Sequence, residues 1–276
     1  MRIHNYINGI EGVAAGGTAV ANIPVNRRYF DFRMFVTGNL AGGGAAQDAD
    51  ELITNVRVYV NSVVIIDLTA TELRKIALLN GLSLTDNQIP IFAAEPWRAT
   101  VTGEESVSWD LLGQQKCTIE LTFASGTENL TFKMNASFDY GRNVSVNDAG
   151  EAQPLLAIVK KTTNTYNAGS GQFDITSLPQ RWPIQRIELQ ASAGTISFLE
   201  CYRDDEKIHE ATVGENNAIL TNQAMDGSQF SYVLAFDSDQ QVSSALQVSK
   251  TLLVRPTFSG SNQCRVITEH RSNGYV

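Results

Sequence analysis

The sequence predicts an all-β protein built from two similar sandwiches in tandem, and three observations carry this prediction. Of the 276 residues, 43% are hydrophobic and only 18% are charged, a composition that suits strands around a buried core. Many short runs alternate apolar and polar residues, which is the period of a half-buried strand. A unit of strand, turn, strand and helix also occurs twice, at 53–81 and at 199–222.

The first copy of this unit, at 53–81, shows each of its parts clearly. Valine occupies every second position of 56–60, as expected for a strand with one buried face. A polar turn and a short β-branched run follow. The segment from Thr69 to Glu72 is a capping box, in which Thr69 begins a helix and Glu72 bonds back to its N–H. Gly81 is placed to end that helix.

The second copy, at 199–222, repeats this order less perfectly. Its capping box runs from Thr212 to Glu215, and Thr212 follows Thr69 by 212 − 69 = 143 positions. The same offset relates Glu72 to Glu215. Because a capping box, a helix face and a preceding hairpin recur at one offset, we interpret the two halves as copies of one fold.

The rest of the first half contains further strands and two segments without a packing signal. Residues 1–17 hold many glycines and few packing residues, so we expect an extended arm. The Gly/Ala-rich segment 38–50 is expected to be a loop. Alternation or β-branched runs predict strands at 18–23, 29–36, 88–92, 97–101, 107–111, 116–123 and 130–138.

The second half has the same organisation. Residues 141–150 are polar and flanked by glycine, so we expect one domain at 1–145, with the N-terminal arm, and a second at 146–276. Further strands are predicted at 154–166, 173–178, 184–191, 229–236, 250–258 and 263–269. About eight strands per half, with a short helix after the fourth, fit two tandem eight-stranded jelly-roll sandwiches.

Charge and cysteine content exclude several classes of function. A net charge of −8 argues against binding the phosphate backbone of nucleic acid, which requires clustered Lys and Arg. The three cysteines, Cys117, Cys201 and Cys264, show no CxxC spacing and are expected to be free thiols. We find neither a signal peptide nor an apolar run of about 18 residues, so we expect synthesis as a soluble protein in a cytoplasm.

No catalytic signature stands out in the sequence. It contains no P-loop, no GxGxxG after a strand and no HExxH. Only His4, His209 and His270 could serve as imidazole bases, and His209 is interpreted as a surface or interface residue. We therefore predict a protein without enzymatic activity.

Three acidic clusters are candidates for calcium, which prefers six to eight oxygen ligands. They are Asp48/Asp50/Glu51, Asp204/Asp205/Glu206 and Asp237/Asp239. None matches an EF-hand loop. The turn at Asp204, Asp205 and Glu206 is the preferred candidate, because it lies at a sandwich end where subunits could meet.

Several stretches of the chain resemble a known family. They are GVAAGGTAVANIPVN near the start, ITNVRVYVNS leading to DLTATEL, GQFDITSLPQ with IQRIELQASAG, and the ending RSNGYV. In their order and spacing they are similar to the double jelly-roll major capsid proteins of icosahedral phages with an internal membrane, most closely the corticovirus type.

This resemblance implies a major capsid protein located in the virion. In that family three chains form a capsomer in which six sandwiches imitate a hexagon, and capsomers tile an icosahedral shell over a lipid membrane. The implied partners are two further copies in a homotrimer, neighbouring capsomers, and vertex and membrane proteins, without direct contact to nucleic acid. No cofactor is required, although some relatives depend on calcium.

Two other functions are compatible with a β-sandwich. One is a carbohydrate- or receptor-binding module, such as a lectin-like domain. The other is a cupin-type enzyme, which is disfavoured because three scattered histidines do not supply the usual metal cluster.

Overall fold

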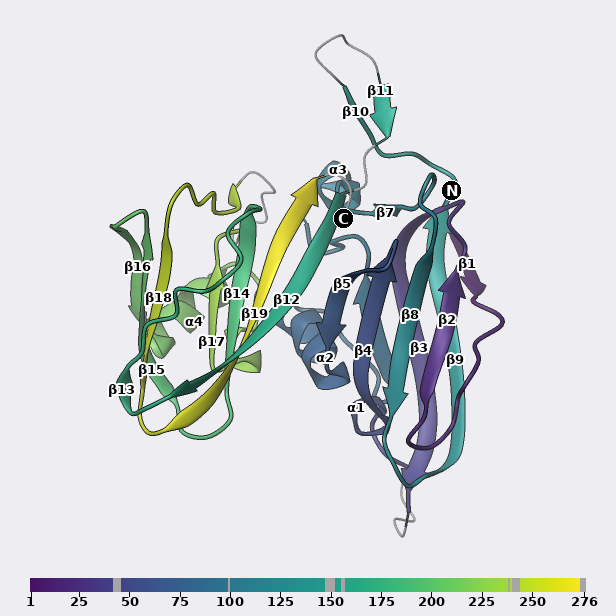
Figure 1. The fold of residues 1–276 in the computed structure, drawn as a ribbon, viewed down its shortest axis with the longest axis horizontal. Coiled ribbons are helices and arrows are strands. Elements are labelled where there is room, and N and C mark those ends of the chain that lie inside the picture. Colours follow the sequence, from purple (N-terminus) through teal and green to yellow (C-terminus); the bar gives the residue numbers. More distant parts are fainter. Residues whose placement is uncertain are drawn as a thin grey trace. The chain divides into compact units, whose positions relative to one another are not determined.

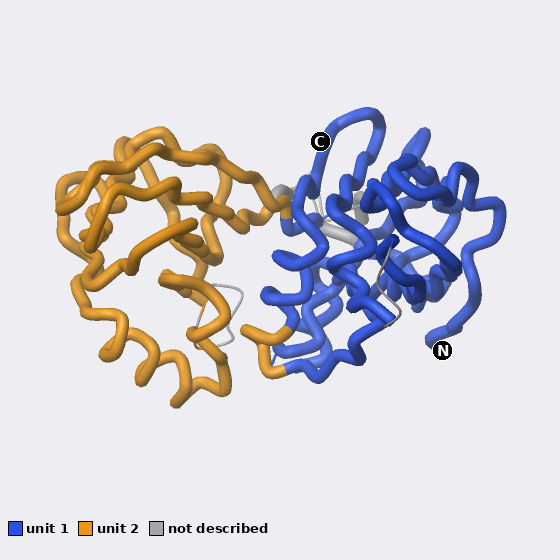
Figure 2. The backbone as a smooth tube through the Cα atoms, turned by 90° about the horizontal axis from the view of Figure 1, so that it is seen from below, with its two compact units in different colours: residues 1–77, 82–159, 272–276 blue, residues 78–81, 160–271 orange. Residues whose placement is uncertain are grey.

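The computed structural model describes residues 1–41, 46–98, 100–146, 152–154, 157–237, 239 and 244–273. Figure 1 shows the helices and strands in chain order. Two compact units are coloured separately in Figure 2: unit 1 is 1–77, 82–159 and 272–276, and unit 2 is 78–81 and 160–271. The units part between 159 and 160, whereas the sequence placed the domain boundary between 145 and 146.

Unit 1 is a sandwich of two antiparallel sheets. Its elements are β1 (Ile3–Tyr6), β2 (Thr18–Ile23), β3 (Arg28–Leu40), α1 (Ala49–Leu52), β4 (Ile53–Val60), β5 (Val63–Leu68), α2 (Ala70–Leu79), β6 (Gln88–Phe92), α3 (Val101–Glu105), β7 (Trp109–Asp110), β8 (Cys117–Phe123), β9 (Thr127–Asp139), β10 (Val144–Val146) and β11 (Ala152–Pro154). One sheet has the order β1-β9-β3-β6, with β7 also paired to β3, and the other has the order β5-β4-β8-β2. Strands β10 and β11 form a separate hairpin.

Unit 2 is a second sandwich of the same kind. Its elements are β12 (Ala157–Ala168), β13 (Gly171–Gln172), β14 (Ile184–Ala191), β15 (Ile196–Arg203), β16 (Glu206–Thr212), α4 (Val213–Asn222), the 3-10 turn η1 (Gly227–Gln229), β17 (Tyr232–Ala235), β18 (Leu252–Phe258) and β19 (Asn262–Asn273). Its sheets have the orders β17-β14-β19-β12 and β13-β18-β15-β16.

Both units follow the jelly-roll strand order. Counting the main strands along each half, the first, third, sixth and eighth share one sheet, and the second, fourth, fifth and seventh share the other. In unit 1 these eight strands are β1 to β6, β8 and β9, and in unit 2 they are β12 to β19. The predicted pair of tandem eight-stranded jelly rolls is therefore confirmed. One detail is wrong, because α2 and α4 follow the fifth strand of their halves and not the fourth.

The duplicated hairpin is visible in the backbone itself. Asn61 and Ser62 join β4 to β5 with φ angles of 49° and 70°, and Asp204 and Asp205 join β15 to β16 with 51° and 70°. Positive φ at both central residues is typical of the type I′ turn, whose twist matches that of the flanking strands. The two turns are 204 − 61 = 143 positions apart, the offset that the capping boxes show.

Side chains that alternate along the strands build the core of unit 1. On β3, Phe32, Met34 and Val36 are fully buried, whereas Arg33 between them is exposed. The valines of β4 at 56, 58 and 60 are likewise fully buried, as their spacing predicted. Trp109 packs on Phe32 with the ring centroids 5.8 Å apart.

Several local predictions for unit 1 are wrong. The predicted arm contains β1, which pairs with β9. The predicted loop 38–50 is shorter, because β3 extends to Leu40 and α1 begins at Ala49; its residues 42–45 lie outside the described part. Of the strand predicted at 97–101, the described residues 97, 98, 100 and 101 are not in a strand. In its place α3 begins at Val101, capped by the Thr100 side chain, which accepts from the Gly103 N–H.

Candidate functional site

The turn that sequence reasoning proposed for calcium is fastened to a neighbouring loop. The Asp204 carboxylate accepts hydrogen bonds from the Ser249 hydroxyl at 2.5 Å and from the N–H groups of Lys250 and Thr251 at 2.7 and 2.9 Å. These bonds, that of the Ser249 hydroxyl foremost, lower the pKa of Asp204 well below its usual range. Asp204 therefore anchors the 249–251 segment in the structure.

The other two carboxylates of this turn are more open. Asp205 and Glu206 are exposed, and Glu206 lies 3.5 Å from the Arg203 guanidinium. Within the described ranges, no three Asp, Glu, His or Cys side chains converge as a metal site would require. Calcium binding at Asp204, Asp205 and Glu206 stays a prediction.

The two remaining acidic clusters contain carboxylates that serve as partners of arginines. Asp50 lies 3.3 Å from the Arg74 guanidinium, on the helix that follows β5. Asp237 is buried and pairs with Arg186 at 2.8 Å. In each of these two clusters, one carboxylate is therefore engaged in an ion pair within the fold.

The three cysteines are buried and His209 is partly buried. Burial raises the pKa of all three cysteine thiols to about 12, so they are protonated at neutral pH. The Nε2 atom of His209 is 2.8 Å from the Tyr232 hydroxyl, which in turn donates to the Ala211 carbonyl. Burial also lowers the pKa of His209. This histidine helps to fix a core tyrosine.

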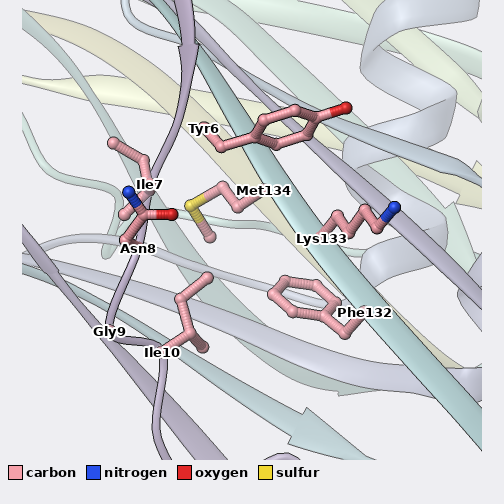
Figure 3. A pocket seen from close by; sticks show the side chains of 8 residues that line it. All are labelled: Tyr6, Ile7, Asn8, Gly9, Ile10, Phe132, Lys133 and Met134. Atoms are coloured by element: carbon pink, nitrogen blue, oxygen red, sulfur yellow. The ribbon is translucent and has the colours of Figure 1, made fainter.

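A surface groove of unit 1 lies between the N-terminal segment and β9 (Figure 3). Its volume is about 420 Å³, and it is lined by Tyr6, Ile7, Asn8, Gly9, Ile10, Phe132, Lys133 and Met134. The Ile7 N–H donates to the Met134 carbonyl at 2.9 Å, after which the chain leaves β9. Gly9 turns with a φ of 73°, a conformation that glycine adopts without strain.

This groove is suited to contacts with apolar groups. Phe132 is half-buried and packs edge-on against Phe123, with the ring centroids 5.8 Å apart, and Tyr6 remains 54% exposed. Along a strand, the main-chain N–H and C=O groups of residues two apart face the same edge. Those of Phe132 therefore face the edge of β9 at which Met134 pairs with Ile7. Sequence reasoning missed this groove because it assigned residues 1–17 to an arm and not to a paired strand.

An ion-pair network fastens the N-terminal segment at one end of unit 1. The Arg2 guanidinium contacts Glu104 at 2.8 Å and Glu105 at 3.0 Å, and it stacks over the Phe30 ring. Arg28 binds both oxygens of Asp139, at 2.9 and 2.7 Å. Such bidentate pairs fix geometry as well as charge. The Arg2 contacts therefore tie the residue before β1 to α3, and the Arg28 pair joins β3 to β9.

A smaller and more polar depression lies on the sheet that contains β4 and β8. Its volume is about 260 Å³, and Tyr59, Ser62, Lys116, Thr118 and Glu120 line it. Because an aromatic ring lies there beside hydroxyl and charged groups, this depression is where glycan binding would be sought.

Taken together, the two units give one chain two jelly rolls, which is the architecture of the double jelly-roll class. Solved structures support this fold assignment. The major capsid protein P2 of bacteriophage PM2 superposes with a TM-score of 0.86 at 16% identity, covering 100% of this chain and 98% of that one. The major capsid protein of Sulfolobus turreted icosahedral virus gives 0.68 at 10% identity, with 98% and 96% covered. The PBCV-1 capsid gives 0.65 at 10% identity, with 99% and 94% covered.

Family models identify the chain more specifically. Residues 4–139 match the N-terminal domain of viral coat protein P2, and residues 158–272 match its C-terminal domain. The chain belongs to the viral coat protein P2 family. No curated protein matches it in sequence.

Membership in this family decides several predictions. The resemblance to double jelly-roll capsid proteins, the role as a viral coat protein and the location in the virion are confirmed. Viral coat proteins are structural proteins, so the prediction of a protein without enzymatic activity is also confirmed. The alternative of a cupin-type enzyme is therefore excluded. Capsid proteins of this fold assemble into capsomers and shells.

Proposed function

We propose that this chain is the major capsid protein of an icosahedral virus and forms homotrimeric capsomers over an internal lipid membrane. The observation that carries the proposal is the match of both halves to the two domains of one coat-protein family. Each chain contributes two jelly rolls, so a trimer presents six sandwiches and imitates a hexagon. That geometry lets a three-fold assembly occupy six-coordinated positions of a shell.

The proposed partners are further copies of the chain, neighbouring capsomers, and vertex and membrane proteins of the virion. Direct binding of nucleic acid is not part of the proposal. The net charge of −8 supports this, because an acidic protein gains nothing from counterion release along a phosphate backbone. No helix in the described part of the chain is long and apolar enough to span a bilayer.

Size-exclusion chromatography with light scattering tests the trimer. Three chains of 30.1 kDa give an expected mass of about 90 kDa, and electron microscopy should show pseudo-hexagonal capsomers. A stable monomer that binds glycans on an array would overturn the proposal in favour of a carbohydrate-binding module. In that case substitutions at Tyr59 and Glu120 would locate the sugar in the polar depression.

Calcium is a separate part of the proposal and needs its own test. We propose that exposed Asp205 and Glu206 supply ligands for a calcium ion at the end of unit 2. Chelation should then lower the melting temperature of the trimer, and the variant D205N/E206Q should no longer respond to the chelator. A melting temperature that chelation leaves unchanged in the wild-type trimer removes calcium from the proposed function.

A further inference from the structure

Unit 2 contains a group of charged side chains buried on one face of the sheet β17-β14-β19-β12. On β14, Ile187 and Leu189 point into the apolar core. Arg186 and Glu188 alternate with them and therefore lie on the opposite face of the sheet. Both are nevertheless buried, with exposures of 1% and 0%. Charged residues are rarely buried to this extent unless they are paired.

Two ion pairs account for most of this group. Lys161 on β12 pairs with the Oε1 atom of Glu269 on β19, and both side chains are buried. The Arg186 Nε and Nη2 atoms donate to the two oxygens of Asp237 at 2.8 and 3.2 Å. The remaining Nη1 donates to the Asn80 side chain at 2.6 Å. Each cation therefore has a carboxylate of its own.

Glu188 is the carboxyl group left over. Neither of its oxygens has a hydrogen-bond partner, and the Oε2 atom of Glu269 also has none. The group contains two cations, Lys161 and Arg186, but three carboxyls. With every group ionised the net charge would be −1, and the unpaired charge would reside on Glu188. A buried ionised carboxylate without a partner is far more costly than the neutral acid.

We propose that Glu188 is a buried proton-binding site, and that the proton it holds is required for the full stability of unit 2. The proton balances the charges of the group, giving two positive and two negative charges. Burial, and next the negative charge of Glu269, raise the pKa of Glu188 well above its usual range, which supports this assignment. The charged groups acting on it are Lys161, Arg186, Asp237 and Glu269.

His270, the neighbour of Glu269 on β19, does not compete for this role. Its pKa is lowered to about 4, chiefly by burial and then by Lys160, so it is neutral at and above neutral pH. A change in stability between neutral and alkaline pH therefore has Glu188 as its source within this group.

The direction of the pH dependence follows from proton linkage. Native Glu188 holds its proton at pH values where the unfolded chain has lost it. The stabilisation is fully present below the unfolded pKa and is lost as pH rises through the folded pKa. Within that interval the native state binds one more proton, so the folding equilibrium constant falls about tenfold for each pH unit.

The variant Glu188→Gln tests this proposal in the full-length protein. Glutamine has the shape of the protonated acid and does not ionise, so the variant should lose the tenfold-per-unit decline and exceed the wild type in stability at alkaline pH. Denaturant unfolding, measured from about pH 5 to pH 9, gives the comparison across the expected interval. Glu210→Gln, the substitution of an exposed glutamate in the same unit, is the matched control and should show the same decline with pH as the wild type.

An infrared measurement keeps the proposal testable if the variant fails to fold. Wild-type protein at neutral pH should show the C=O stretch of a protonated carboxylic acid, and the band should disappear on unfolding. Absence of this band, or a Glu188→Gln variant whose stability declines with pH as steeply as the wild type, would overturn the proposal.

Discussion

Asp204 and Glu188 show that the partners of a carboxyl group, and not its exposure alone, set its effect on stability. Asp204 is at the surface, yet three residues of the 249–251 segment bond to it. Glu188 is fully buried, yet its oxygens have no partner. The bonds lower the pKa of Asp204, and burial raises that of Glu188. Alkaline pH should therefore weaken the contribution of Glu188, and acid that of Asp204.

The substitution Asp204→Asn should destabilise unit 2 at neutral pH and have less effect in acid. Asparagine accepts the φ of 51° at this turn, but its amide cannot accept at both positions as the carboxylate does. The lowered pKa provides stability above the unfolded pKa, and this stability is lost as pH falls through the folded pKa. Thermal unfolding should show a loss of a few degrees at neutral pH.

Asp205→Asn is the matched control for that prediction, because Asp205 has the same left-handed backbone and is exposed. With a chelator present, so that no calcium is bound, it should leave the melting curve nearly unchanged. Equal effects of the two substitutions would mean that the hydrogen bonds to the 249–251 segment contribute nothing to stability.

The buried thiols should be unreactive in the native protein. Cys117, Cys201 and Cys264 are buried, and their pKa values are raised to about 12. At about pH 8 only about one thiol in ten thousand is then ionised, and the thiolate is the reactive form. A chromogenic disulfide reagent should detect three thiols in denaturant and none rapidly in native protein. Rapid stoichiometric reaction of the native chain would contradict this expectation.

At the scale of elements, the two capping boxes show how much a short motif determines. The Thr69 N–H donates to Glu72 at 2.8 Å, and the Thr212 N–H donates to Glu215 at 2.9 Å. In return each threonine hydroxyl accepts from the N–H of its glutamate, at 3.2 and 3.3 Å. Every contact lies within four residues, so the sequence alone was enough to predict where α2 and α4 begin.

Removing the cap of either helix should lower stability by a similar amount. Thr69→Ala and Thr212→Ala each leave helix N–H groups without an acceptor, which typically costs about 1 kcal/mol. Denaturant titration measures the difference. Thr221→Ala is the control within α4, because its hydroxyl bonds to the Asn217 carbonyl inside the helix, and alanine there favours the helix. A control variant as unstable as Thr212→Ala would show that the cap has no special role.

Elements fixed by distant contacts were not predictable in this way. Strand β1 exists because Ile3 to Tyr6 pair with β9, more than one hundred residues later, and Arg2, the residue before it, is tied to Glu104 and Glu105. Nothing in the glycine-rich segment 1–17 signals that pairing. The strand predicted at 97–101 ended at Val101, where α3 begins instead, because the Thr100 side chain caps that helix. In the first half, the helix was placed after the fourth strand because β1 was not counted.

For the whole molecule, repetition predicted the architecture, but periodicity did not identify which strands are neighbours. The offset of 143 between the hairpins implied two equal sandwiches, and the sheets confirm eight main strands in each. The groove beside Phe132 and the buried charged group around Glu188 could not be predicted from the sequence. Each gathers residues from segments far apart in sequence, and Glu188 reads locally as the polar position of an alternating strand.

The net charge of −8 should make association of the chains depend on ionic strength. Like-charged copies repel over the Debye length, which shrinks from about 30 Å at 0.01 M salt to about 8 Å at 0.15 M. Monovalent salt should therefore favour association, seen as a rise in mean mass by light scattering. The double variant E11Q/E128Q changes exposed residues and brings the net charge to −8 + 2 = −6, so it should associate at lower salt. If salt instead dissociates the assembly, ion pairs between copies outweigh the general repulsion, and the interfaces should be sought among charged surfaces before the apolar groove beside Phe132.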